Sequence, residues 1–89
     1  MSSVHLAFSS DGLRPLSALA EGARGIVVEV RWHNGGRTDR LLALGVTPGA
    51  TVEVLQTFPG IVFLCDQTEL AVERAIADAV LVKPLERAS

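Results

Sequence analysis

Short apolar stretches separated by turn residues run along most of the chain, and their periodicity predicts mainly β-strands. From Thr51 the period is two, so that Val52 and Val54 fall on one face and Thr51, Glu53 and Leu55 on the other. Further strands are predicted over 25–32, 61–65, 69–73 and 80–85. Five strands of about five residues, joined by brief turns, predict a small β-barrel.

The pattern also predicts which side chains share a face of each strand. In the stretch 25–32, Val28, Val30 and Trp32 lie on one face, and the turn-forming sequence His-Asn-Gly-Gly at 33–36 follows. The stretch 61–65 is apolar throughout and predicts a fully buried strand. In 69–73 the alternation predicts that Leu70 and Val72 face inward.

Helical signals are brief. Pro15, a capping Ser17 and the spacing of Leu16 and Leu19 predict one helical turn that ends at Gly22. A second turn is predicted over 74–79, in the sequence Arg-Ala-Ile-Ala-Asp-Ala. The barrel is therefore expected to carry one short helix and one or two helical turns.

The stretch Leu-Leu-Ala-Leu-Gly-Val-Thr-Pro-Gly-Ala, 41–50, predicts that short helix and its abrupt end. Thr38 or Asp39 can cap the helix, and Leu41 and Leu44 are expected to face the core beside Leu42. Gly45 stands where a helix favours a left-handed residue after its last turn. Thr-Pro-Gly-Ala then matches a type II turn, with Pro48 second and Gly49 third.

Length and composition predict one folded domain. The chain has 89 residues, of which 48% are hydrophobic and 20% charged, a balance that disordered chains do not have. We expect residues 13–85 to form the barrel, residues 1–12 a flexible serine-rich tail and residues 86–89 a C-terminal tail. No apolar run approaches the length of about 18 residues that spans a bilayer. We expect a soluble protein in the cytoplasm, without direct insertion into a membrane.

Charge and aromatic content argue against binding to nucleic acids. The formal net charge is −2, and the only aromatic residues are Phe8, Trp32, Phe58 and Phe63. Nucleic-acid binders neutralise phosphates with basic patches and stack bases on aromatic side chains. This composition therefore does not favour a nucleic acid as the partner.

The reactive side chains do not indicate an enzyme. Cys65 with His33 as its base could act as a nucleophile, but Cys65 ends an apolar strand and is expected to be a buried, inert thiol. Metal-ligand candidates are Cys65, Asp66, Glu69, Glu73 and His33. Cysteine and histidine would favour zinc or ferrous iron as a cofactor, whereas carboxylates favour harder ions. No pair of them has recognisable ligand spacing, and Glu69 and Glu73 fit the solvent-facing side of a strand.

The sequence Arg-Leu-Leu-Ala-Leu-Gly-Val-Thr-Pro-Gly-Ala-Thr-Val-Glu-Val-Leu, 40–55, resembles the ferrous iron transport protein A (FeoA) family. It has that family's Leu-x-x-Leu-Gly turn, then Pro-Gly, then a β-branched strand. Residues 15–30 and 69–82 are similar to the family's opening and closing patterns, so the resemblance spans about 13–85. Two features depart from many relatives. The loop after Pro59 is shorter here. Relatives also carry an arginine directly after the stretch 69–72, where this chain has Glu73, with Arg74 one position later.

The resemblance implies an SH3-like barrel and an accessory role in bacterial ferrous iron transport. The implied partner is the FeoB-type GTP-binding membrane permease, on which the protein would dock and which it would modulate. The same barrel forms the C-terminal domain of metal-dependent repressors. The alternative is therefore a transition-metal-binding or regulatory domain. An unpaired barrel edge could also pair weakly with a second copy.

Within this resemblance, two overlapping groups of residues are expected to have separate roles. We expect the partner to contact the segment around the short helix and turn: Arg40, Leu42, Val46 and Pro48. Leu42, next to the core-facing Leu41 and Leu44, is expected to be the exposed apolar contact. The framework of the motif comprises Leu41, Leu44, Gly45, Pro48 and Gly49.

Overall fold

The computed structural model describes residues 12–31 and 37–85. In chain order its elements are β1 (Arg14–Pro15), η1 (Leu16–Ala18), β2 (Arg24–Val30), α2 (Arg37–Ala43), β3 (Thr51–Gln56), β4 (Ile61–Cys65), β5 (Thr68–Val72), α3 (Arg74–Ala77) and β6 (Val80–Pro84). The tails at 1–11 and 86–89, Trp32, and the turn at 33–36 lie outside the described residues. So do the side chains of Thr38 and Asp39, which leaves their capping role a prediction.

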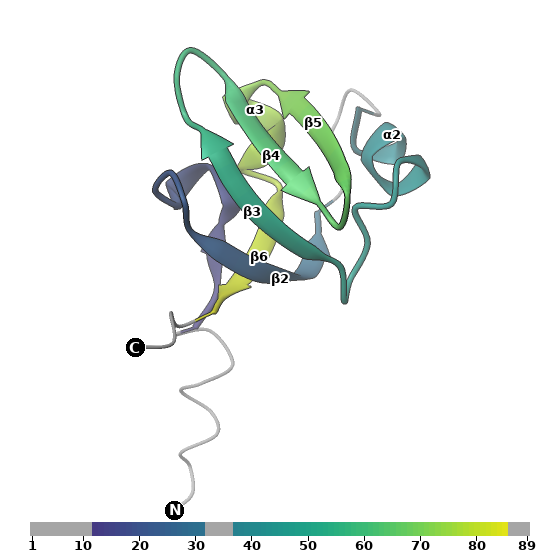
Figure 1. The fold of residues 1–89 in the computed structure, drawn as a ribbon. Coiled ribbons are helices and arrows are strands. Elements are labelled where there is room, and N and C mark those ends of the chain that lie inside the picture. Colours follow the sequence, from purple (N-terminus) through teal and green to yellow (C-terminus); the bar gives the residue numbers. More distant parts are fainter. Residues whose placement is uncertain (1–11, 32–36, 86–89) are drawn as a thin grey trace, which may run out of the picture.

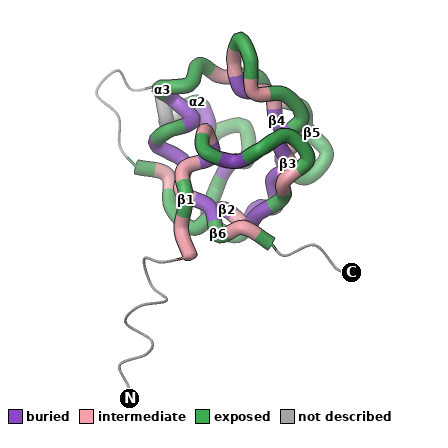
Figure 2. The backbone as a smooth tube through the Cα atoms, turned by 90° about the vertical axis from the view of Figure 1, so that its left-hand side faces the viewer, coloured by how far each residue is buried: buried purple, intermediate pink, exposed green. Residues whose placement is uncertain are grey.

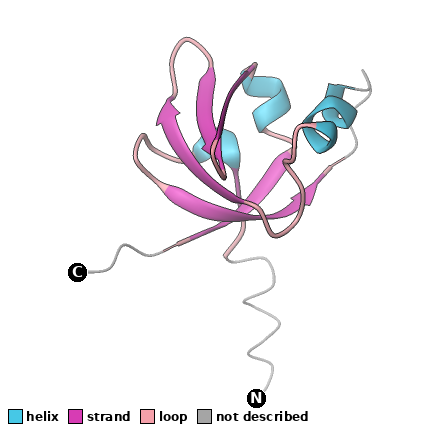
Figure 3. Cartoon of the chain, turned by 45° about the vertical axis from the view of Figure 1, so that its right-hand side comes forward, coloured by secondary structure: helices cyan, strands magenta, loops and turns pink. Residues whose placement is uncertain are grey.

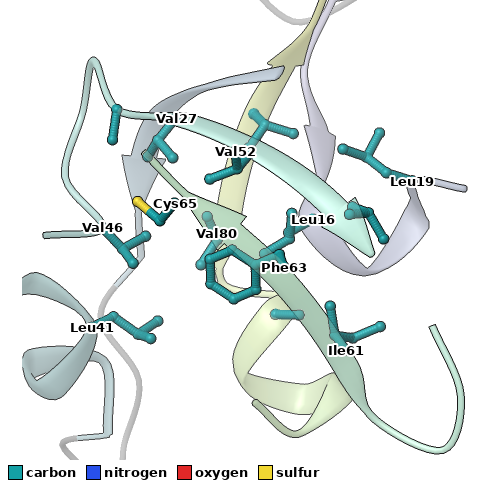
Figure 4. Close-up of a cluster of buried hydrophobic side chains, with 14 of the residues drawn as sticks. Leu16, Leu19, Val27, Leu41, Val46, Val52, Ile61, Phe63, Cys65 and Val80 are labelled. Carbon is teal, nitrogen blue, oxygen red and sulfur yellow. The ribbon is translucent and has the colours of Figure 1, made fainter. Parts of the chain in front are cut away.

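All six strands pair antiparallel in one sheet, in the order β1-β6-β2-β3-β4-β5. The sheet curls around a single core (Figure 1), so that Phe63 of β4 lies against Leu16 and Val80 from the other end of the strand order (Figure 4). This arrangement confirms the predicted small β-barrel. The sixth strand, β1, was not predicted, because its two residues are too few to show a periodicity.

Burial alternates along the strands as the sequence predicts for β3 (Figure 2). Val52 and Val54 are fully buried. On β4 the prediction of a fully buried strand was wrong, because only Ile61, Phe63 and Cys65 are buried. The two residues between them point to the outer face and are half-buried. An all-apolar sequence is therefore compatible with a sheet that is covered on one face only.

A β-bulge changes the faces of β2. The pairing of β2 with β6 shifts register between Val27 and Glu29, so that Val28 is an extra residue on the bulged strand. Val27 is 1% exposed and Val28 is 42% exposed, whereas Val30 packs against the core. The expectation that Val28 and Val30 share a face was wrong, because a bulge interrupts the period of two. The strand also ends at Val30, before Trp32.

The η1 and α3 segments lie together between the two ends of the sheet (Figure 3). The guanidinium of Arg74 donates to the carbonyl oxygens of Ser17 at 3.3 Å and Thr57 at 2.6 Å. The hydroxyl of Ser17 donates to the carboxylate of Asp78. Ser17 therefore lies inside η1 and bonds to the residue that follows α3, and the prediction that it caps the turn was wrong. The residue that precedes η1 is Pro15, which has no side-chain donor or acceptor.

Candidate functional site

The end of α2 and the turn after it form the segment in which partner contacts are expected. The amide of Val46 donates to the carbonyl of Leu41 at 2.9 Å, and that of Gly45 to Leu42 at 3.1 Å. Together with the φ of +99° at Gly45, these bonds make a Schellman motif, which satisfies the last carbonyls of a helix. The left-handed conformation predicted at Gly45 is confirmed.

The β-turn at 47–50 redirects the chain into β3. The amide of Ala50 donates to the carbonyl of Thr47 at 2.9 Å, and Gly49 has a φ of +98°. A positive φ at the third residue is what a type II turn requires. The amide of Gly49 also bonds to the carbonyl of Val27 at 2.8 Å, which fixes the turn to β2.

Replacing Gly45 by alanine should lower the free energy of unfolding by about 1–2 kcal/mol, because a β-carbon is disfavoured in the left-handed region. Nothing lies within 4 Å of a β-carbon built there, so the loss comes from the backbone alone. Urea denaturation measures it. Gly45→Asn is the matched control, because asparagine tolerates this conformation and should lose less. Equal losses in the two variants would show that the backbone conformation is not the cause.

Burial separates the expected contact residues into two groups. Arg40, Leu42 and Pro48 are exposed, whereas Val46 is fully buried and has no surface to offer a partner. Val46 was expected in the contact set, and its position after Gly45 explains the error. In a Schellman motif the residue after the glycine packs back against the last helical turn, here against buried Leu41.

The leucines of this segment also differ from expectation. Leu41 is buried, whereas Leu42 and Leu44 are 44% and 46% exposed. The prediction that Leu44 faces the core was wrong. Leu44 follows the last residue of α2, and the chain then turns so that Val46 takes the buried position. The exposed residues Arg40, Leu42, Leu44 and Pro48 are called the α2 surface below; α2 lies at the side of the barrel (Figures 1 and 3).

The buried side chain of Cys65 links β4 to the chain segment that follows α2. Its thiol donates to the carbonyl oxygen of Gly45 at 3.6 Å, and the side chain is buried. Burial raises the pKa of the Cys65 thiol, and the neighbouring carboxylate of Asp66 raises it further. A neutral, buried thiol is a poor nucleophile and a poor metal ligand. The structure thus gives Cys65 a packing role.

The raised pKa of Cys65 makes stability depend on pH in the alkaline range. As the pH rises past the ordinary value of 9.0, the unfolded chain loses the thiol proton while the folded protein keeps it. The contribution of this thiol to stability is complete below that pH and is lost above it. Urea denaturation between neutral pH and strongly alkaline pH should show the decline, and Cys65→Ala should reduce it. An unchanged decline in the variant would contradict this assignment.

The metal-ligand candidates do not converge. Cys65 faces the core from β4, whereas Glu69 pairs with Leu64 on the outer face of the same hairpin. Among residues 12–31 and 37–85, no group of three His, Cys, Asp or Glu side chains is placed to hold a metal ion. Glu73 precedes α3, and His33 lies outside the described residues.

No helix in the described part of the chain combines the length and the apolar character needed to cross a lipid bilayer.

Comparisons with known proteins agree with the fold. A search of curated proteins found no match. The crystal structure of an iron uptake regulatory protein, FeoA, is 33% identical, with a TM-score of 0.72, over 82% of this chain and 99% of that one. Stenotrophomonas maltophilia FeoA complexed with zinc, described as a prokaryotic SH3 domain protein, is 23% identical, with a TM-score of 0.70, over 76% and 87%.

The barrel also occurs within a longer protein. A manganese-dependent transcriptional repressor is 21% identical, with a TM-score of 0.74, over 82% of this chain but only 42% of the repressor. That likeness shows a shared fold. The family model of the FeoA domain matches residues 14–84. Together with the 33% identity to a solved FeoA, this match shows that the chain belongs to the FeoA family of ferrous iron transport.

Proposed function

We propose that the protein is a small cytoplasmic accessory of bacterial ferrous iron transport that binds the FeoB-type GTP-binding permease and modulates it. In this role it has no chemistry of its own. Membership of the FeoA family supports the transport role. The observation that carries the binding role is the exposure of Leu42 and Leu44 on a segment whose backbone is firmly held.

The α2 surface has the properties of a protein contact. The Schellman bonds, the turn at 47–50 and buried Leu41 fix the backbone, so little conformational entropy is lost when a partner covers it. Two half-exposed leucines supply apolar area, and Arg40 supplies a charge that can direct the encounter. Interfaces depend on a few such anchor residues, surrounded by contacts that matter less.

The purified protein and the cytosolic GTP-binding portion of the permease test the proposal by calorimetry and by the rate of GTP turnover. Leu42→Asp should weaken binding by about tenfold or more, because a carboxylate replaces an apolar anchor. Leu85→Asp is the matched control, since Leu85 is similarly exposed and directly follows β6. The proposal fails if the wild-type protein neither binds nor changes the turnover. Equal weakening by both variants would instead exclude the α2 surface.

A further inference from the structure

The outer face of β3, β4 and β5 carries an apolar row. Val62 lies opposite Gln56 of β3 and Ala71 of β5. The register shift between Val54 and Gln56 places Leu55 beside the same row. The residues that alternate with these fill the core, so Leu55, Val62 and Ala71 point outward.

Phe58 follows Leu55 closely, in the loop between β3 and β4. It is 79% exposed, the largest fraction among the exposed large hydrophobic residues of the described chain. The amide of Thr57 donates to the carboxylate of Glu21 at 3.4 Å, and Arg74 binds the carbonyl of Thr57. A β-carbon on Gly60 would lie 3.3 Å from a carbonyl oxygen of β5. The backbone of the loop is thus held at Thr57, and the ring of Phe58 is exposed to solvent.

Carboxylates flank this apolar area. Leu64, two residues along β4 from Val62, is paired with Glu53 on one side and Glu69 on the other. Asp66 is exposed in the turn between β4 and β5. Arg24 of β2 lies opposite Glu53 of β3 and offsets its charge. The acidic character of the face is therefore strongest on the β5 side. An apolar centre with acidic flanks complements a partner that is apolar and cationic.

The charge also discriminates between candidate occupants. A second copy of this chain would bring Glu53 and Glu69 against the same residues of its partner, and like charges across an interface are unfavourable. An anionic lipid surface would be repelled for the same reason. A cationic protein segment has the opposite sign and is favoured.

The geometry favours a helix over an extended segment. Over β4, at the centre of this face, the backbone groups are paired with β3 and β5, so a segment bound there meets side chains. A strand bound over β4 would leave its own amides and carbonyls unpaired, whereas a helix satisfies them internally. Val62 and Leu64 are two residues apart on a strand, about 7 Å, which is close to the roughly 6 Å between residues i and i+4 of a helix. Glu53 and Glu69 are separated by two strand spacings, about 10 Å, which is close to the width of a helix.

We propose that this β3–β5 face, comprising Leu55, Val62, Leu64 and Ala71, with Phe58 in the loop at its end, binds a cationic amphipathic helix of a partner protein. The apolar side of the helix covers Val62 and Leu64, with Phe58 against one end. Lysine or arginine side chains on its flanks meet Glu53 and Glu69. This face is separate from the α2 surface, and its role does not depend on the identity of the permease as a partner.

Amide NMR spectra of the labelled protein test the proposal, with a synthetic helical peptide of leucine on one face and lysine on the other as the probe. Saturable shifts are expected at Leu55, Val62, Leu64 and Glu69, with an affinity that falls as salt is added. Phe58→Ala should weaken binding by about fivefold to tenfold. Glu69→Gln should weaken it less and should reduce the salt dependence. Both residues are exposed, so the variants should remain folded.

Leu44→Ala is the matched control, because it removes a half-exposed hydrophobic side chain from the α2 surface. Its affinity for the peptide should equal that of the wild-type protein. Three results would overturn the proposal: equal binding of a leucine–glutamate peptide, shifts spread over Glu21 and Asp78 as strongly as over Glu69, or a loss in Leu44→Ala as large as in Phe58→Ala. Absence of saturable shifts would overturn it as well.

Discussion

Phe63→Ala should lower the free energy of unfolding by about 3–5 kcal/mol, which is a large part of the stability of a domain this small. Phe63 is the largest of the fully buried side chains and contacts residues from several elements of the barrel (Figure 4). Its removal loses the transfer free energy of the ring and leaves a cavity that the short, paired strands cannot fill by moving together. Urea denaturation monitored by circular dichroism measures the loss.

Leu64→Ala is the control, because Leu64 is the next residue on β4 and is only half-buried on the outer face. This variant should lower the free energy of unfolding by roughly 1 kcal/mol or less, since much of the Leu64 side chain is in water in both the folded and the unfolded state. A similar loss in the two variants would mean that β4 does not have the inward and outward faces described above.

The second large effect is expected at Leu41, for which replacement by alanine should lower stability by about 2–5 kcal/mol. Leu41 is the buried leucine of α2 and packs with Val46 where the helix meets the barrel. Because α2 is short and peripheral, loss of this contact should also release it locally before the barrel unfolds. Hydrogen exchange of the amides of Leu44 and Val46 should therefore become faster.

Leu42→Ala and Leu44→Ala are the matched controls, since they remove the same side chain from the same segment. Both leucines are nearly half exposed, so each change should lower stability by about 1 kcal/mol or less. If Leu44→Ala proved as destabilising as Leu41→Ala, the exposed position of Leu44 would be wrong.

The parts of the fold that could be predicted from sequence are those whose signal is local. Val52 and Val54 are buried because a regular period of two on β3 has no interruption before them. Gly45 and Gly49 adopt a positive φ because the helix end and the turn each need it at one position. Such features are encoded within a few neighbouring residues, and the period of two in several short stretches was enough to predict a β-rich domain.

The errors arose where a long-range contact decides the local structure. Val28 points outward because β2 bulges against β6, which is more than fifty positions away in the chain. Ser17 bonds to Asp78, which is 61 positions away in the chain, and the sequence around Ser17 shows nothing of that partner. At the candidate site, exposed Leu42 was predicted, whereas exposed Leu44 and buried Val46 depend on how the helix end turns. The outer face of β3, β4 and β5 was missed because its residues come from three strands.

The pairing of β1 with β6 has a consequence for how this barrel can be combined with other domains. Arg14 lies opposite Val82 in an antiparallel register, so the chain enters and leaves the fold at neighbouring points, as Figure 1 shows. A unit with adjoining entry and exit can be appended to another domain, or inserted into one of its loops, without altering the path of any strand. Adjoining ends make such a unit easy to reuse, in keeping with the appearance of a similar barrel as a minor portion of a manganese-dependent repressor.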